Sequence, residues 1–81
     1  MSPEQCRAAR GWLGWSQQEL ADHANVGLST VRDFEAGRRQ PITNNLDAIQ
    51  RAIEEAGIRF TFRADRPVGI ELAESRKRSQ R

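Results

Sequence analysis

Residues 27–41, GLSTVRDFEAGRRQP, decide the fold and raise the question of what a short helix with this surface contacts. Val31 and Phe34 lie three positions apart and predict the buried side of a helix over about residues 28–36, which Gly37 ends in a left-handed conformation. The outward positions and the exit of this helix carry Leu28, Ser29, Arg32, Asp33, Arg38 and Arg39. The helix therefore presents polar side chains and paired positive charge to its surroundings.

Two helices are predicted before this one, and each begins with a capping pattern. Ser2 and Gln5 flank a proline and have the form of a capping box with proline at the first helical position. Ser16 and Glu19 form a second capping box about three residues after the first helix ends. Residues 25–27, NVG, then permit a tight turn, because asparagine tolerates the left-handed conformation and glycine allows close re-entry. The pattern is helix, turn, helix.

After the short helix, the pattern predicts a fourth helix and then strands. The fourth helix should begin after Pro41 and Thr43 and end at Gly57, because three apolar residues recur at helical spacing: Leu46, Ile49 and Ile53. Beyond Gly57 the apolar period changes from 3.6 to 2 in two sets: Ile58, Phe60 and Phe62, then Val68, Ile70 and Leu72. This alternation predicts a β-hairpin, or two strands completed by a partner. The fold class is therefore mainly α, with four or five helices and C-terminal β-strands.

The composition excludes several classes of protein. Eighty-one residues with a hydrophobic fraction of 37% and a charged fraction of 30% fit one small soluble domain, and no apolar run approaches the ~20 residues that cross a bilayer. The N-terminus lacks the apolar segment of a signal peptide, and the single Cys6 cannot form an internal disulfide, so we expect a cytoplasmic location. One histidine and one cysteine are too few for a zinc site. No catalytic triad or phosphate-binding glycine loop is present, so we expect neither an enzyme nor a cofactor.

Charge is divided unevenly along the chain. Residues 1–57 contain six arginines and eight acidic residues, a net charge of −2, whereas residues 58–81 contain seven basic and three acidic residues, a net charge of +4. The end of the chain, ESRKRSQR, is a polar basic run and predicts a disordered tail over residues 74–81. Bulk charge therefore does not identify a nucleic-acid partner, and the argument depends on where the arginines lie.

The stretch GWSQQELADHANVGLSTVRDFEAGRRQP resembles the helix-turn-helix core of the Xre and phage-repressor family, the lambda-repressor-like or Cro/C1-type proteins. The resemblance covers about residues 3–57 and includes SQ at the start of the second helix, ELA within it, TV entering the third helix and FEAGR closing it. Gly27 departs from the usual hydroxyl N-cap, and Asn25 stands where glycine is commoner. The resemblance implies a lambda-repressor-like DNA-binding domain over residues 1–57. The strand element over residues 58–73, predicted from its alternation, lies outside the resemblance.

The short helix is then a recognition helix, because an α-helix fits the major groove and its outward residues meet base edges. Leu28 either contacts a thymine methyl or packs on the preceding helix. Ser29 suits several base edges or a phosphate, and Arg32 either reads guanine with two hydrogen bonds or clamps a phosphate. Asp33 either accepts a hydrogen bond from cytosine or pairs with a neighbouring arginine.

Phosphate contacts are expected on both sides of this helix. The resemblance implies such a contact for Gln17, and the positive end of the second helix independently predicts it. The full predicted set is Gln17, Gln18, Arg38, Arg39, Thr43 and Asn44. The alternative for the two arginines is a solvated loop. The resemblance also implies a structural ion pair between Arg10 and Glu35, and we expect Trp12 and Trp15 to pack in the core and turn around Gly14.

A second copy of the chain is expected, because one recognition helix is too small to specify a promoter. The apolar residues of the strands predict that residues 58–73 pair with the same strands of another chain, through Ile58, Phe60, Phe62, Val68, Ile70 and Leu72. A two-fold dimer would bind a palindromic operator in double-stranded DNA and repress by occupying a promoter. The alternative is a protein-interaction module such as an antitoxin or anti-activator, in which the helix-turn-helix is only a scaffold.

Overall fold

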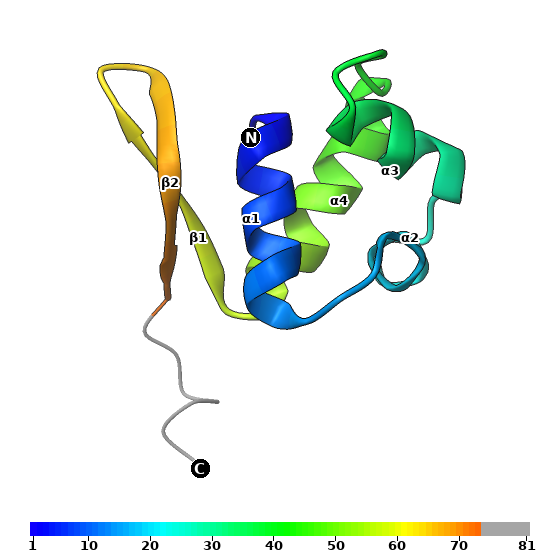
Figure 1. Ribbon diagram of the computed structural model, residues 1–81, viewed down its shortest axis with the longest axis horizontal. Coiled ribbons are helices and arrows are strands. Elements are labelled where there is room, and N and C mark those ends of the chain that lie inside the picture. The colour runs from blue at the N-terminus through cyan, green and yellow to red at the C-terminus, as the bar shows by residue number, and fades with distance from the viewer. Residues whose placement is uncertain (74–81) are drawn as a thin grey trace, which may run out of the picture.

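The computed structural model describes residues 1–73, and it contains four helices followed by a two-stranded antiparallel sheet (Figure 1). The elements are α1 (Pro3–Leu13), α2 (Gln17–Ala24), α3 (Leu28–Glu35), α4 (Thr43–Glu55), β1 (Ile58–Arg63) and β2 (Arg66–Leu72). The predicted fold class is confirmed. The disordered tail predicted for residues 74–81 lies outside the described residues.

The starts of α1 and α2 follow from the capping patterns. The Ser2 side chain accepts a hydrogen bond from the backbone of Gln5, whose own side chain accepts from the Ser2 backbone, and Ser16 and Glu19 form the same reciprocal pair. Each box satisfies two backbone N–H groups that have no partner within the helix. Asn25 ends α2 with φ 60°, in the left-handed conformation predicted for it.

The other two helices begin without a side-chain cap. Gly27 precedes α3 and Ile42 precedes α4, and neither residue has a side-chain atom that could accept a hydrogen bond from the helix that follows. Thr43, expected just before α4, is its first residue. These helices are stabilised by packing, since α3 buries Val31 and Phe34 and α4 buries Ile49 and Ile53.

One core joins the helices to the hairpin. Figure 1 shows the hairpin on one side of α1, with α2 and α3 on the other. Ile58 and Phe60 are 1% and 7% exposed and belong to the same buried cluster as the helix side chains. Burying them stabilises the fold by roughly 1.5–3 kcal/mol each. Both were predicted to contact a second chain, and this prediction is wrong, because these side chains have almost no exposed surface to offer.

Gln5 fastens the hairpin to α1. The strands pair within the chain, from Ile58 opposite Leu72 to Arg63 opposite Arg66, and the register shifts between Thr61 and Phe62. At this irregularity the side-chain amide of Gln5 donates 2.9 Å hydrogen bonds to the carbonyl oxygens of both Thr61 and Gly69. Gln5 is only 3% exposed, so it satisfies two acceptors that the disturbed ladder leaves open. The same side chain therefore caps α1 and positions the sheet.

The two tryptophans differ in burial. Trp15 is half-buried, and its ring stacks on His23 with centroids 4.1 Å apart and an interplanar angle of 9°. Trp12 was also expected to pack in the core or turn, and this is wrong, because it is 62% exposed on the side of α1 that meets β2. Position 12 follows the buried Cys6–Ala9 stripe by three residues, but Leu13 occupies the inward place at this turn of the helix.

The hairpin turn is a site where one substitution should stabilise the protein. Ala64 and Asp65 have φ values of 50° and 73°, the left-handed conformations that a two-residue turn requires and that alanine adopts at a cost of roughly 1–2 kcal/mol. Ala64→Asn should therefore raise the free energy of unfolding by about 1 kcal/mol, measured by urea denaturation. Ala56→Asn, at an exposed position after α4 where φ is −82°, should give no such gain.

Candidate nucleic-acid interface

The outward face of α3 carries the four residues predicted to read bases. Ser29 and Arg32 are exposed, whereas Leu28 and Asp33 are half-buried. Their exposure follows from helical spacing, because Val31, Phe34 and Glu35 occupy the buried side of the same eight-residue helix. Ser29 and Arg32 are thus the most accessible hydrogen-bonding side chains of this face.

Asp33 is paired with one of the arginines that follow the helix. A carboxylate oxygen of Asp33 lies 3.2 Å from the Arg38 guanidinium, and the Arg38 backbone N–H donates a 2.9 Å hydrogen bond to the Asp33 carbonyl. Arg38 is 71% exposed, so the ion pair contributes little to stability. Its effect is on the surface potential, because it neutralises the one carboxylate on the outward face of α3 and holds Arg38 beside that face.

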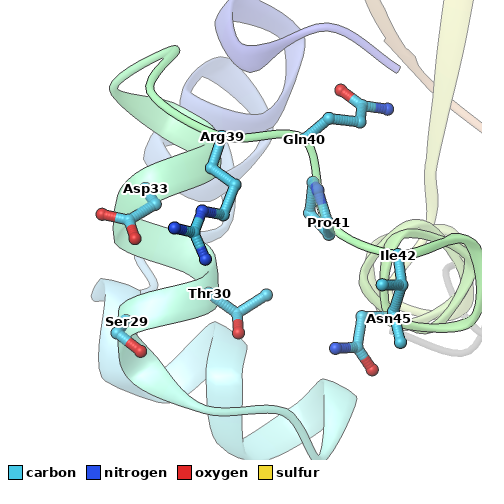
Figure 2. A pocket seen from close by; sticks show the side chains of 8 residues that line it. All are labelled: Ser29, Thr30, Asp33, Arg39, Gln40, Pro41, Ile42 and Asn45. Atoms are coloured by element: carbon cyan, nitrogen blue, oxygen red, sulfur yellow. The ribbon is translucent and has the colours of Figure 1, made fainter.

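A hollow of about 210 Å³ separates α3 from the chain that leads into α4. Figure 2 shows Arg39 reaching back across it toward α3, with Ile42 and Asn45 on the α4 side. The sequence argument missed Thr30 of α3 and also four residues that line this hollow after the double arginine: Gln40, Pro41, Ile42 and Asn45. Their position after the double arginine was the only available signal, because their types alone do not indicate a binding surface.

The remaining predicted phosphate-binding residues lie at helix starts, but two of them have partners within the chain. The Gln17 amide donates a 2.9 Å hydrogen bond to Glu35, and the Gln18 amide donates one of 2.9 Å to Asp22. Thr43 and Asn44 are exposed in the first turn of α4. Gln17 is therefore held in place by α3, which fixes the start of α2 relative to the recognition helix.

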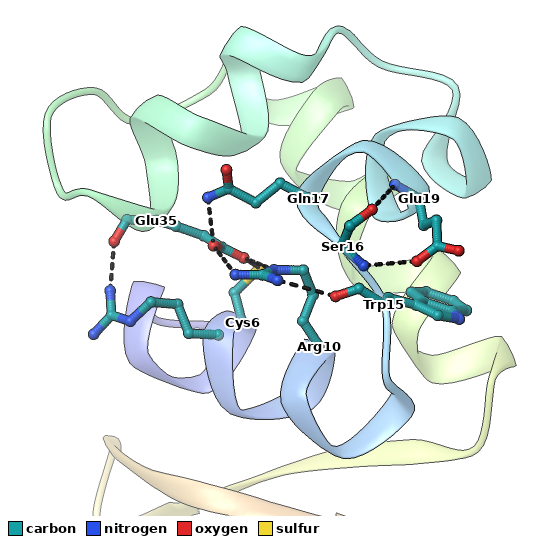
Figure 3. Close-up of polar contacts among 8 residues, drawn as sticks. Cys6, Arg10, Trp15, Ser16, Gln17, Glu19 and Glu35 are labelled. Carbon is teal, nitrogen blue, oxygen red and sulfur yellow. Dashed lines mark hydrogen bonds and ion pairs between the residues drawn. The ribbon is translucent and has the colours of Figure 1, made fainter.

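Behind this surface lies a polar network centred on Glu35. Figure 3 shows the Arg10 guanidinium between the Glu35 carboxylate and the Trp15 carbonyl. Arg10 donates two 2.8 Å hydrogen bonds to the two carboxylate oxygens, and the Glu35 side chain is only 2% exposed. Cys6 also donates to Glu35 at 3.1 Å. This bidentate ion pair joins α1 to α3, and the Gln17 hydrogen bond to Glu35 adds α2 to the network.

Arg7 is a further basic residue that the sequence argument missed. Its guanidinium donates to the backbone carbonyl of Glu35, at the end of α3. It lines a hollow of about 320 Å³ whose other lining residues are Arg10, Gln17, Arg32, Glu35, Ala36 and Arg38. Because Arg10 already neutralises Glu35, the remaining arginines give this hollow a positive charge. The available signal was the spacing of three between positions 7 and 10, which places both on one side of α1.

The stability that the Glu35 network contributes depends on pH. Burial alone raises the pKa of Glu35, but hydrogen bonds from Arg10, Gln17 and Cys6, together with the Arg10 charge, outweigh burial and lower it. The stability that Glu35 contributes is thus complete above the pKa of an unfolded glutamate, about 4.3, and is lost as pH falls through the lower folded value. Glu35→Gln should destabilise the protein at pH 7, and its difference from the wild type should shrink as pH falls below about 4.3, measured by denaturation at each pH. A difference that stays constant with pH would contradict this.

Cys6 should be chemically inert in the folded protein. Its side chain is fully buried, and burial, reinforced by the hydrogen bond and charge of Glu35, raises the pKa of the thiol. Only the thiolate reacts with iodoacetamide, so alkylation at pH 8 should be at least about 100-fold slower than in urea-unfolded chain. Labelling at similar rates in the two states would show that α1 opens readily.

Other kinds of site are not found in residues 1–73. Among these residues no three histidine, cysteine, aspartate or glutamate side chains are grouped to hold a metal ion. None of the four helices has the length and hydropathy needed to span a bilayer.

Comparisons with known proteins agree with this geometry. A helix-turn-helix family model matches residues 7–55, more than half of the chain. The match begins within α1, includes α2, α3 and α4, and stops before the hairpin. Comparison with curated proteins gives no match.

Proposed function

Because the chain belongs to the Xre/lambda-repressor-like helix-turn-helix family, a family of DNA-binding regulators, we propose that it is a homodimeric repressor of transcription. It binds an inverted-repeat operator in double-stranded DNA, with one α3 in the major groove at each half-site. Consistent with the expectation from the sequence, it acts in the cytoplasm.

The observation that supports this proposal is the distribution of side chains around α3. Exposed Ser29 and Arg32 face outward, and Arg38 and Arg39 follow directly, within reach of the same surface. Base-reading groups flanked by phosphate-binding groups are what groove recognition requires. A scaffold that only bound another protein would not need four exposed side chains of this kind on one surface.

The proposed mode of regulation is repression. The proposed mechanism is occupancy, in which the bound dimer blocks polymerase. The hairpin supplies the contact between two copies. With Ile58 and Phe60 buried in the core, the remaining apolar residues proposed for this contact are Phe62, Val68, Ile70 and Leu72.

Selection of bound sequences from a random pool of double-stranded DNA tests the proposal. We expect an inverted repeat whose half-sites lie about one helical turn, roughly 34 Å, apart. Arg32→Ala should lose the recovered consensus. An unpaired half-site would refute the dimeric operator, and a pool with no enrichment would refute sequence-specific binding.

A further inference from the structure

The hollow between α1 and the end of α3 brings four arginines together. Arg7 and Arg10 come from α1, Arg32 comes from α3 and Arg38 from the turn after it, and all four line the same space of about 320 Å³. Arg32 and Arg38 already belong to the proposed DNA surface, and Arg10 holds Glu35. Arg7 is therefore the arginine of this hollow whose charge has no partner in the network or in the proposed site.

Arg7 and Arg10 differ in how much of each guanidinium is already used. Arg10 donates three hydrogen bonds, two to the Glu35 carboxylate and one to the Trp15 carbonyl, and its side chain is 20% exposed. Arg7 is exposed, and among residues 1–73 it donates a single hydrogen bond, to the Glu35 carbonyl. Because a guanidinium carries several N–H groups in a planar fork, most of those of Arg7 remain for a ligand.

The one contact that Arg7 makes fixes it at the end of α3. Glu35 is the last residue of α3, and in the described part of the chain no backbone N–H donates to its carbonyl. Arg7 supplies the missing donor and places a positive charge at the negative end of the helix dipole. The guanidinium is thus positioned before any ligand arrives, which reduces the entropy that binding costs.

The charge of this hollow suits an anion. Its lining contains four arginines and one carboxylate, that of Glu35, a sum of +3, and the pairing of Arg38 with Asp33 outside the lining lowers this to +2. The Glu35 carboxylate does not compete for Arg7, because other side chains already donate to both of its oxygens. Guanidinium groups bind phosphate oxygens through paired, charge-assisted hydrogen bonds. A phosphate group is therefore the ligand that this hollow fits.

We infer that Arg7 binds a phosphate of the DNA backbone, which adds α1 to the DNA-contacting surface. The inference rests on the proposed DNA-binding regulator and goes beyond it, because it assigns a phosphate contact outside α2, α3 and the start of α4. Arg32 connects the two regions, since it is exposed on the outward face of α3 and also lines the hollow. A groove that takes up α3 therefore brings its backbone past the hollow. Without Arg7, the negative end of α3 would face that backbone.

The salt dependence of DNA binding tests the inference on the full chain. Arg7→Gln keeps a side-chain N–H for the Glu35 carbonyl but loses the charge. It should weaken binding to operator and scrambled DNA alike, by about tenfold, and reduce the slope of log affinity against log salt by about 0.9. Arg7→Lys should keep the wild-type slope. The matched control Arg51→Gln, the same change at an exposed arginine of α4, should keep both affinity and slope.

A purely structural role for Arg7 gives a different result. If Arg7 only completes the end of α3, Arg7→Gln should lose stability to urea but keep the wild-type salt slope. That outcome would overturn the inference.

A second measurement locates the contact on the DNA. Backbone phosphates of the operator are replaced one at a time by neutral methylphosphonates. At one position in each half-site, the loss of affinity should be about tenfold in wild type and should disappear in Arg7→Gln, because the charge that meets this phosphate is already gone. Losses that are the same in both proteins at every position would overturn the inference, even if Arg7→Gln binds more weakly.

Inorganic phosphate distinguishes the DNA backbone from a free phosphate as the ligand. At equal ionic strength, phosphate and chloride should displace DNA from wild type equally. Stronger displacement by phosphate, lost in Arg7→Gln while the salt slope keeps its wild-type value, would assign the hollow to a free phosphate and overturn the contact with DNA.

Failure of the inference and failure of the proposed function give different results. If selection enriches an inverted repeat but Arg7→Gln keeps the wild-type salt slope, the proposed function stands and the inference fails. If no sequence is enriched but Arg7→Gln still lowers the slope on scrambled DNA, the sequence-specific regulator fails and the phosphate contact stands.

Discussion

Arg10→Ala should lower the free energy of unfolding by about 3–5 kcal/mol, because it leaves the Glu35 carboxylate buried without its counter-ion. Arg10 supplies two of the hydrogen bonds that hold this 2%-exposed side chain, and it also donates to the Trp15 carbonyl. Gln17 and Cys6 remain, but neither carries a positive charge. Urea denaturation followed by circular dichroism measures the difference.

The control for this prediction is Arg51→Ala, which removes an exposed arginine from α4 and should change the free energy of unfolding by no more than about 0.5 kcal/mol. The double variant Arg10→Ala/Glu35→Ala should lose less than the sum of the two single variants, because no charge is then left alone. Equal melting temperatures for wild type and Arg10→Ala would show that water or a rearranged Gln17 replaces the arginine.

The starts of α1 and α2 could be predicted because the capping residues that determine each start lie within four residues of sequence. The reciprocal bonds of Ser2 with Gln5 and of Ser16 with Glu19 depend only on residues that lie three positions apart in sequence. The two strands were predicted for a similar reason, since strand alternation is a local pattern. Pairing with the strands of a second chain was predicted, with a hairpin as the alternative, and the structure has the hairpin. The choice depends on the turn, where Ala64 and Asp65 adopt conformations that their types do not favour.

Which face each element buries could not be predicted from local pattern alone. Ile58 and Phe60 alternate as Phe62 does, yet only the first two are covered, because α1 and α4 reach only part of the hairpin. Trp12 is exposed for a related reason, since the strand beside it leaves its ring outside the core. The second role of Gln5 was equally hidden, because the carbonyls it binds lie 56 and 64 residues away in sequence.

In the candidate site, too, some features could be predicted from local sequence and others could not. The outward positions of α3 follow from helical period, whereas the partners of individual side chains follow from tertiary structure. Gln17 was predicted only as a phosphate ligand, and its bond to Glu35 depends on how α2 meets α3. For Asp33, pairing with a neighbouring arginine was one of two alternatives, and the bond to Arg38 is present.

Variants of the recognition surface should fall into two classes when bound to operator DNA. Arg32→Ala and Ser29→Ala should relax base preference, with a loss of about 1–3 kcal/mol in discrimination at the base pair that Arg32 reads. Arg39→Ala should weaken binding to all sequences alike and reduce the slope of log affinity against log salt by about 1. Fluorescence anisotropy on the operator and on scrambled DNA, over a range of salt concentrations, measures both effects. A changed base preference with an intact salt slope in Arg39→Ala would mean that the two roles are reversed.

Arg38 belongs to the phosphate-binding class, but its effect on binding depends on its ion pair with Asp33. The carboxylate holds Arg38 beside α3 and offsets its charge, so Arg38→Ala should weaken binding uniformly but leave an unpaired anion facing DNA. Asp33→Asn would remove that anion while keeping the side chain's shape.

If Asp33 only orients Arg38, the Asp33→Asn variant should bind operator and scrambled DNA more tightly by similar factors, with a steeper salt slope. If Asp33 instead accepts a hydrogen bond from cytosine, the operator alone should lose affinity, and the loss should map to one base pair. Comparing the two DNAs in Asp33→Asn therefore assigns the residue, because an electrostatic effect is shared by all sequences and a base contact is not.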